Sequence, residues 1–327
     1  MKGKGKKGPK KIKQVWRKKP PPPPPWIELP RDITANILQR LGAVEILGTA
    51  QKVCSTWYSV CKDPTFWRVI DMRDLDIDDM EYSLNSMCRH AVDLSQGQVI
   101  DINIEYFGTD ELLEYIAERC SQLKRLRIAC CDSLSGEAVS RFPLLEELHL
   151  FFNSLSSESL EMVGRSCPLL KSLSLNDRGS RYLNDDDYVE EYDEEALTIA
   201  KSMPGLRHLR LFGNSLTNKG LQTILDGCPH LESLDLRQCY GLQLNGDLGK
   251  RCSQQIKSLR LPYDSTADYE FPGAIDDFEY GGFSDFEAEF SYDGDDYLRY
   301  YDDYTRWDHE DYWDADDYDI HDFFSLE

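Results

Sequence analysis

Hydrophobic residues in the middle of the chain recur in one short pattern, Leu-x-x-Leu-x-Leu, in which isoleucine or valine sometimes replaces leucine. Successive copies end 22 to 25 residues apart, except for one interval of 36 between Leu175 and Leu211. The copies end at Ile104, Ile128, Leu150, Leu175, Leu211, Leu236 and Leu261. A period of this length indicates a solenoid, because one such unit cannot bury its apolar face without its neighbours.

Each copy predicts a short strand, and the residues between copies predict a helix that leads to the next strand. Four copies are followed by the Asn or Cys that is typical of a leucine-rich repeat. These residues are Cys131, Asn153, Asn214 and Cys239. We therefore expect an α/β fold, with about seven parallel strands on a concave face and helices outside. The one long interval predicts an acidic insertion near 177–195, which would form a loop on one face of the solenoid.

The segment 26–72 has a different pattern, that of three short helices separated by turn signals. Leu29-Pro30 opens the first helix, for which Asp32 is the expected N-cap. Gly42 separates the first helix from the second, and Asp63-Pro64 ends the third. A unit of this size buries little surface alone, so we expect it to present a face to a partner.

This segment resembles an F-box, and most closely the F-box of plant proteins that also carry leucine-rich repeats. The residues that carry the resemblance are Leu29-Pro30, Ile33, Ile37, Leu41, Ile46-Leu47, Val53-Cys54, Trp57, Asp63-Pro64 and Phe66-Trp67. The resemblance implies docking on a Skp1-type adaptor and, through it, on a cullin–RING ubiquitin ligase. The implied adaptor-binding residues are Leu29, Pro30, Ile33, Leu41, Ile46, Leu47, Val53 and Trp57. The family usually has arginine after the cysteine of Cys-x-x-Trp, where this chain has Ser55.

Charge divides the chain further. Residues 1–25 contain ten Lys or Arg and no acid, and end in a run of prolines, whereas residues 262–327 contain 23 Asp or Glu and two Arg. Both segments are predicted to be disordered tails on either side of the F-box (26–72) and the repeats (73–261). The basic arm fits either a solubilising tail or a nuclear-import signal. Its charge gives unspecific affinity for nucleic acid at most, so we predict no specific nucleic-acid partner.

The composition also limits where the protein acts and what it binds. No apolar run reaches the roughly 20 residues that span a bilayer, and the first residues lack the apolar region of a secretory signal. We therefore expect the nucleus or cytoplasm, no membrane partner, and ten reduced cysteines. Because cysteines recur at one position of the repeat, as at Cys120, Cys167 and Cys228, we interpret them as packing residues. No metal or cofactor is predicted.

Residues that alternate with the core leucines should point into the concave face. The predicted contact residues for a target are Arg125, Arg127, His149, Phe151, His208, Arg210, Phe212, Arg237 and Arg260. Arginines beside aromatic rings suit an acidic or phosphorylated protein partner. The alternative is a solvated surface without selectivity. The acidic, aromatic tail is a second candidate ligand, which would fold over this face and compete with the target.

The sequence contains no phosphate-binding loop, Gly-x-Ser-x-Gly motif or His-Glu-x-x-His motif. Together with this absence, the resemblance to an F-box implies a non-enzymatic substrate receptor of an SCF (Skp1–cullin–F-box) ubiquitin ligase, in which the repeats hold the protein target. One alternative is a leucine-rich scaffold that binds a Skp1-like protein without driving ubiquitin transfer. A further alternative is a nuclear regulator whose acidic tail recruits the transcription machinery.

Overall fold

The computed structural model describes residues 29–73, 84–131, 134–153, 155–176 and 193–270. The chain divides into two units, residues 1–264 and 265–327, and every helix and strand given below belongs to the first. The basic arm, most of the acidic insertion and most of the acidic tail lie outside the described residues. The predictions made for those segments therefore stay predictions.

The F-box segment forms the three helices that its pattern predicts. They are α1 (Arg31–Leu38), α2 (Gly42–Gly48) and α3 (Ser55–Cys61), with 3-10 turns at Ala50–Lys52 and Pro64–Arg68. The expected N-cap Asp32 is wrong, since it lies inside the first turn and Pro30 occupies the N-cap position. The carbonyl of Pro30 accepts a hydrogen bond from Thr34 N at 3.0 Å, so the proline starts the helix without a side-chain cap.

Parallel strands form one sheet whose spatial order is the order of the chain. The strands are β1 (Val69–Met72), β2 (Asp101–Glu105), β3 (Arg125–Ala129), β4 (Glu147–Phe151), β5 (Ser172–Asn176), β6 (His208–Arg210), β7 (Ser233–Asp235) and β8 (Ser258–Arg260). The sheet has eight strands, one more than the repeat pattern predicts. The additional strand is β1, in which Ile70 and Met72 are buried, so the last residues of the predicted F-box begin the sheet.

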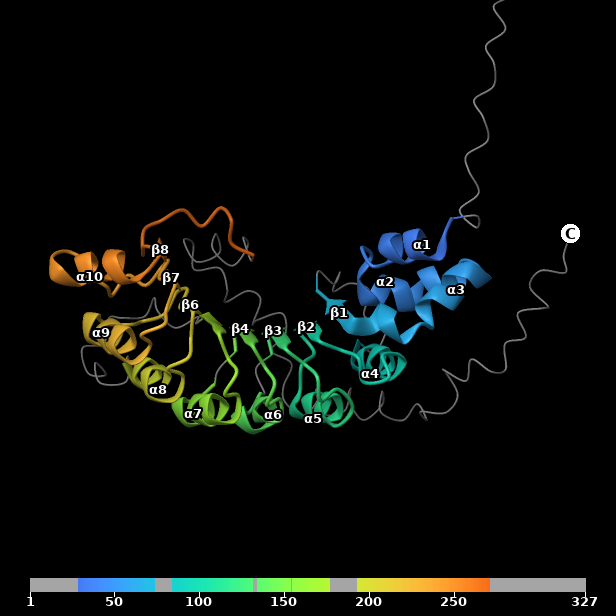
Figure 1. Cartoon of the computed structure of the whole chain (residues 1–327), viewed down its shortest axis with the longest axis horizontal. Coiled ribbons are helices and arrows are strands. Elements are labelled where there is room, and N and C mark those ends of the chain that lie inside the picture. The colour runs from blue at the N-terminus through green and yellow to red at the C-terminus, as the bar shows by residue number, and fades with distance from the viewer. Residues whose placement is uncertain (1–28, 74–83, 132–133, 154, 177–192, 271–327) are drawn as a thin grey trace, which may run out of the picture. The chain divides into compact units, whose positions relative to one another are not determined.

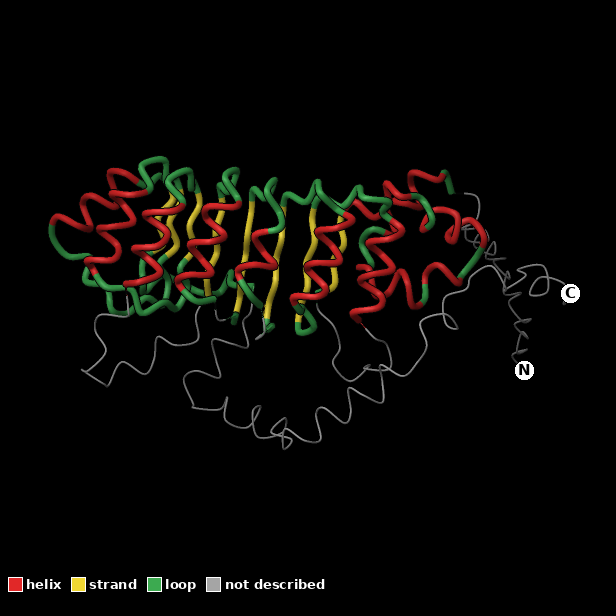
Figure 2. The backbone as a smooth tube through the Cα atoms, turned by 90° about the horizontal axis from the view of Figure 1, so that it is seen from below, coloured by secondary structure: helices red, strands yellow, loops and turns green. Residues whose placement is uncertain are grey.

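The helices after β1 lie along one face of the sheet, and Figure 2 shows them as a row in front of the strands. They are α4 (Leu84–Leu94), α5 (Asp110–Arg119), α6 (Gly136–Ser140), α7 (Ser157–Ser166), α8 (Glu194–Ser202), α9 (Asn218–Gly227) and α10 (Asp247–Gln255). In Figure 1 strand and helix alternate from the F-box helices to α10. The alternation confirms the predicted solenoid. Glu194 and Glu195, assigned above to the insertion, form the first turn of α8.

The pattern leucines and the cysteines fill the space between sheet and helices. Leu126, Leu148 and Leu173 are fully buried, as are Cys120 and Cys228. All ten cysteines are free thiols. Burial raises the pKa of Cys228 to about 11, so this thiol stays protonated and packs as a small apolar group. In the described part of the chain, no group of His, Cys, Asp or Glu side chains is placed to hold a metal ion.

A turn held by Asn or Cys ends several strands. Asn153 Nδ2 donates to the carbonyls of Ile128 and Phe151, and its Oδ1 accepts from Cys131 N at 3.0 Å. The preceding Phe152 has a φ of 55°, which turns the chain out of the strand. The predicted Asn and Cys positions therefore bridge consecutive repeats.

The sheet ends in a turn just beyond the predicted last repeat. Pro262 O accepts from Gln238 N at 2.9 Å, and the ring of Tyr263 lies 5.3 Å from that of Tyr240. Asp264 Oδ2 then accepts from the backbone N–H of Leu261 at 2.8 Å. The repeat unit thus extends a few residues past the predicted boundary at 261. No helix within the described ranges is long and apolar enough to cross a membrane.

Candidate adaptor and target interfaces

The F-box segment exposes large apolar side chains. Ile33 is 43% exposed, Leu41 is 42% exposed and Val53 is 56% exposed, and they come from α1, the turn before α2 and the turn before α3. Pro30 is also exposed and Leu29 is half-buried. We call these five residues the apolar face. These five are predicted adaptor-binding residues, and each is accessible to a partner at least in part.

An ion-paired clamp fixes the helix that carries Ile33. Arg31 donates to Ser59 Oγ at 2.9 Å and to Asp63 Oδ2 at 3.1 Å, which joins the start of α1 to α3 and to the turn after it. Hydrogen bonds from Thr65 and Arg31 lower the pKa of Asp63. The clamp therefore keeps α1 in place while its apolar residue faces solvent.

Trp57 is half-buried, as Leu29 is, and it packs against the core. Its indole Nε1 is buried and has no hydrogen-bond acceptor among the described residues. A buried donor without an acceptor costs about 1–3 kcal/mol. The ring of Trp57 nevertheless packs against the core, and only part of it is accessible.

Ile46 and Leu47 correct the predicted adaptor interface. Their side chains are 4% and 0% exposed, respectively, because α2 packs against β1 and α4. Both residues belong to the core of this chain. The prediction that they contact an adaptor was wrong, because the family pattern gives their place in sequence but not which side of α2 is covered by the repeats.

The strand register confirms which residues share each row of the concave face. Arg125 lies opposite Glu147 and Asp101, while Arg127 lies opposite His149. Further along the sheet the first row contains Ser172, His208, Ser233 and Ser258, and the second contains Ser174, Arg210, Asp235 and Arg260. The alternation of core and concave positions is thus as predicted for the strands.

Three of the predicted contact residues are buried, which corrects the target interface. Phe151 is 1% exposed, Phe212 is 3% exposed and Arg237 is 3% exposed. Each ring lies under a guanidinium from the next or preceding repeat. Arg127 lies 4.9 Å from the centroid of Phe151, and Arg237 lies 5.6 Å from that of Phe212. Aromatic contact with a target through these phenylalanines is therefore excluded in this conformation.

Acidic neighbours offset part of the predicted positive charge of the concave face. Arg125 Nε lies 2.8 Å from Asp101 Oδ2, in the repeat before it. Asp235 accepts from the buried Arg237 at 2.8 Å and lies 3.6 Å from Arg210 Nε. The contact residues predicted from the sequence include neither Asp101 nor Asp235. The face is therefore a mixture of paired charges.

A further row of charged residues is not among those predicted from the sequence. It consists of the residues immediately before strands β3 to β8, which are Lys124, Glu146, Lys171, Arg207, Glu232 and Lys257. We call this row the leading edge of the sheet. The signal was present in the sequence, because the first variable position of six Leu-x-x-Leu-x-Leu copies is charged.

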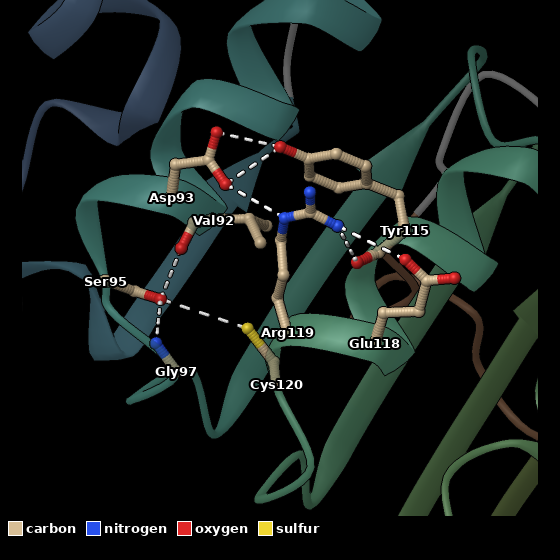
Figure 3. Close-up of polar contacts among 8 residues, drawn as sticks. All are labelled: Val92, Asp93, Ser95, Gly97, Tyr115, Glu118, Arg119 and Cys120. Atoms are coloured by element: carbon tan, nitrogen blue, oxygen red, sulfur yellow. Dashed lines mark hydrogen bonds and ion pairs between the residues drawn. The ribbon is translucent and has the colours of Figure 1, made fainter.

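The helices carry ion pairs of a different kind. Figure 3 shows Arg119 of α5 beside Asp93 of α4, with Tyr115 donating to the same carboxylate. The Arg119 guanidinium lies 3.5 Å from the centroid of the Tyr115 ring. Burial and the hydrogen bond to Asp93 raise the pKa of Tyr115 to about 12. Farther along, Arg141 pairs with Glu114 and Arg251 with Asp226, so each of these arginines reaches an acid on the preceding helix.

Comparison with known families agrees with the two parts of the fold. An F-box-like family model matches residues 26–73, a model described as "FBD-associated F-box protein At5g56370, LRR repeats" matches residues 100–184, and a leucine-rich-repeat model matches residues 204–225. Among curated proteins of Arabidopsis thaliana, F-box protein SKIP19 is 48% identical over 292 residues, which are 88% of this chain and 92% of that protein.

The chain belongs to the plant F-box/leucine-rich-repeat proteins. Putative F-box/LRR-repeat protein 23 of the same plant is 53% identical over 73% of this chain and 54% of its own length. Putative F-box protein At4g05475 is 48% identical over 75% of this chain and 82% of its own length. The family is thus established over both the F-box and the repeats.

Proposed function

We propose that this F-box/leucine-rich-repeat protein is the substrate-recognition subunit of an SCF ubiquitin ligase. Its F-box binds a Skp1-type adaptor, and its repeats bind the protein that is to be ubiquitinated. The chain itself performs no covalent step, and catalysis comes from holding the target near the ubiquitin-carrying enzyme. It acts in the nucleus, the cytoplasm or both.

The observation that carries the proposal is the apolar face. Exposed Ile33, Leu41 and Val53 remain uncovered although the same segment has a core of its own that continues into the repeats. Several exposed large apolar side chains on one short helical unit favour a protein partner. The separate sheet of the repeats leaves a second surface for a target, as a receptor requires.

The first test is capture of a Skp1-type adaptor and cullin by the full chain. The variant Ile33→Asp/Leu41→Asp removes two apolar contacts without touching the core. Its matched control is Met162→Asp/Leu197→Asp, because these residues are 44% and 49% exposed on α7 and α8. We expect wild type and control to capture the adaptor and the F-box variant to lose at least about 90% of the signal.

Target turnover in cells separates a ligase subunit from a scaffold. The ligase predicts that proteins bound by the repeats are stabilised in cells that express Ile33→Asp/Leu41→Asp. Adaptor capture with unchanged turnover would instead support the scaffold. Equal capture by both variants would overturn the assignment of the apolar face.

A further inference from the structure

The leading edge continues the backbone ladder of the sheet by one residue. Lys171 N donates to Glu146 O at 2.8 Å, and Arg207 N donates to Lys171 O at 2.8 Å. Consecutive members are therefore one strand apart, about 4.8 Å. The six residues span about 24 Å along the edge, the length of about seven residues of extended peptide.

Four cations share two carboxylates along this edge. Glu146 accepts from Lys124 at 2.9 Å and from Lys171 at 2.7 Å. Glu232 accepts from Arg207 and Lys257, each at 2.9 Å. The two bridged triads meet at Lys171 and Arg207, so two cations lie side by side at the centre. On a chain with a net charge of −22, the edge is a local excess of positive charge.

The turns that lead to these strands add apolar surface but no charge. Residues 120–123, 142–145, 167–170, 203–206 and 228–231 contain no Asp, Glu, Lys or Arg. Their exposed members include Pro143, Pro168, Pro204 and Pro229, and Leu169 is 45% exposed. A row of exposed prolines therefore accompanies the leading edge through four consecutive repeats.

We propose that the leading edge binds an extended acidic segment of a protein partner, with carboxylates placed against Lys171 and Arg207 and apolar side chains against the prolines. This interaction deepens the proposed function, on which it rests for the identity of the partner as the ubiquitination target. It places the charged contact of the target at the edge of the sheet, in addition to the concave rows.

The structure favours a protein partner over a nucleic acid. Glu146 and Glu232 interrupt the cations, so a uniform row of phosphates would meet a carboxylate at every third position of the edge. The turns expose proline and leucine, whereas single-stranded nucleic acid requires aromatic rings on which its bases stack. A peptide can place neutral residues against the glutamates.

The test measures binding of a fluorescein-labelled deca-glutamate peptide to the full chain in 50 mM NaCl. The variant Lys171→Glu/Arg207→Glu reverses the two central charges. The control Arg141→Glu/Arg251→Glu changes the charge equally and breaks exposed ion pairs on the helices. We expect the first variant to weaken binding at least about fivefold and the control less than about twofold. Any contribution of the Lys-rich arm is common to all three proteins.

Two further measurements keep the result unambiguous. The neutral variant Lys171→Gln/Arg207→Gln should show an intermediate affinity, and its circular dichroism melting curve checks that the fold is kept. Equal affinities of wild type and Lys171→Glu/Arg207→Glu overturn the proposal, as does stronger binding of a deca-adenylate oligonucleotide that is lost in the same variant. The assay contains no adaptor or cullin, so its failure is distinguishable from failure of the ligase function.

Discussion

The apolar face of the F-box segment and the charged rows of the repeats differ in how each satisfies its exposed groups. On the apolar face, water contacts the side chains of Ile33, Leu41 and Val53, which form no hydrogen bonds with it. On the leading edge, by contrast, Lys171 and Arg207 form ion pairs and still contact solvent. A partner on the apolar face would be held by burial, which scales with area. A partner on the leading edge would be held by charge, which salt screens. The two proposed partners would thus be held by different forces.

Breaking the buried ion pair between Asp235 and Arg237 should cause the largest loss of stability. Asp235→Asn leaves Arg237, which is 3% exposed, beside a neutral group, so we expect a loss of about 3–5 kcal/mol in the free energy of unfolding. Asp226→Asn is the control, because that aspartate is 67% exposed and pairs with Arg251. Asp226→Asn should lower the free energy of unfolding, measured by urea titration, by about 1 kcal/mol or less. Equal losses in both variants would show that burial does not govern these pairs.

Substitution of two leucines distinguishes the core of the F-box segment from its apolar face. Leu47→Ala should lower the free energy of unfolding by about 2–5 kcal/mol, because Leu47 is fully buried. Leu41→Ala should change stability by less than about 1 kcal/mol and instead weaken adaptor binding, because Leu41 is 42% exposed. Urea titration and adaptor binding of both variants give the comparison. A folded Leu47→Ala protein with weakened adaptor binding would restore Leu47 to the interface.

Buried thiols of the repeats should make the stability of the chain fall at alkaline pH. Burial raises the pKa of Cys88 and of Cys239 to about 12, from an ordinary value of 9.0. The folded state therefore keeps protons that the unfolded chain releases, and stability falls as pH rises above about 9. The slope for each thiol rises through this range and approaches about 1.4 kcal/mol per pH unit near pH 10. Urea unfolding between pH 8.5 and 10 measures it, and Cys88→Ala should lower the slope; a flat profile would contradict the assignment.

Salt should change the affinity of the F-box for the adaptor only slightly and should clearly weaken the affinity of the repeats for the acidic peptide. Between 0.05 and 0.5 M NaCl, we expect adaptor affinity to change less than about threefold, because the apolar face carries no charge. Binding of the acidic peptide should fall more than adaptor binding over the same range. Fluorescence anisotropy measures both interactions on one protein preparation. The comparison fails if both affinities fall equally.

The predicted concave residues illustrate what a strand pattern can and cannot give. Arg125, Arg127 and His149 lie in the rows that alternation predicts, since side chains of a strand alternate whatever the neighbours are. Phe151 lies in the predicted strand as well, but it is covered by Arg127 from the preceding repeat. Exposure depends on residues about 25 positions away, which a periodic pattern does not compare.

By itself, the sequence determined the order of strands and helices, the register of the repeats and the place of the F-box. These features follow from local spacing, because the same positions of the Leu-x-x-Leu-x-Leu pattern are buried in each repeat. Only the tertiary structure decided which of those residues reach solvent. It assigned Ile46 and Leu47 to the core, brought Arg210 to Asp235, and placed Lys171 beside Arg207, because each of these depends on two segments meeting in space.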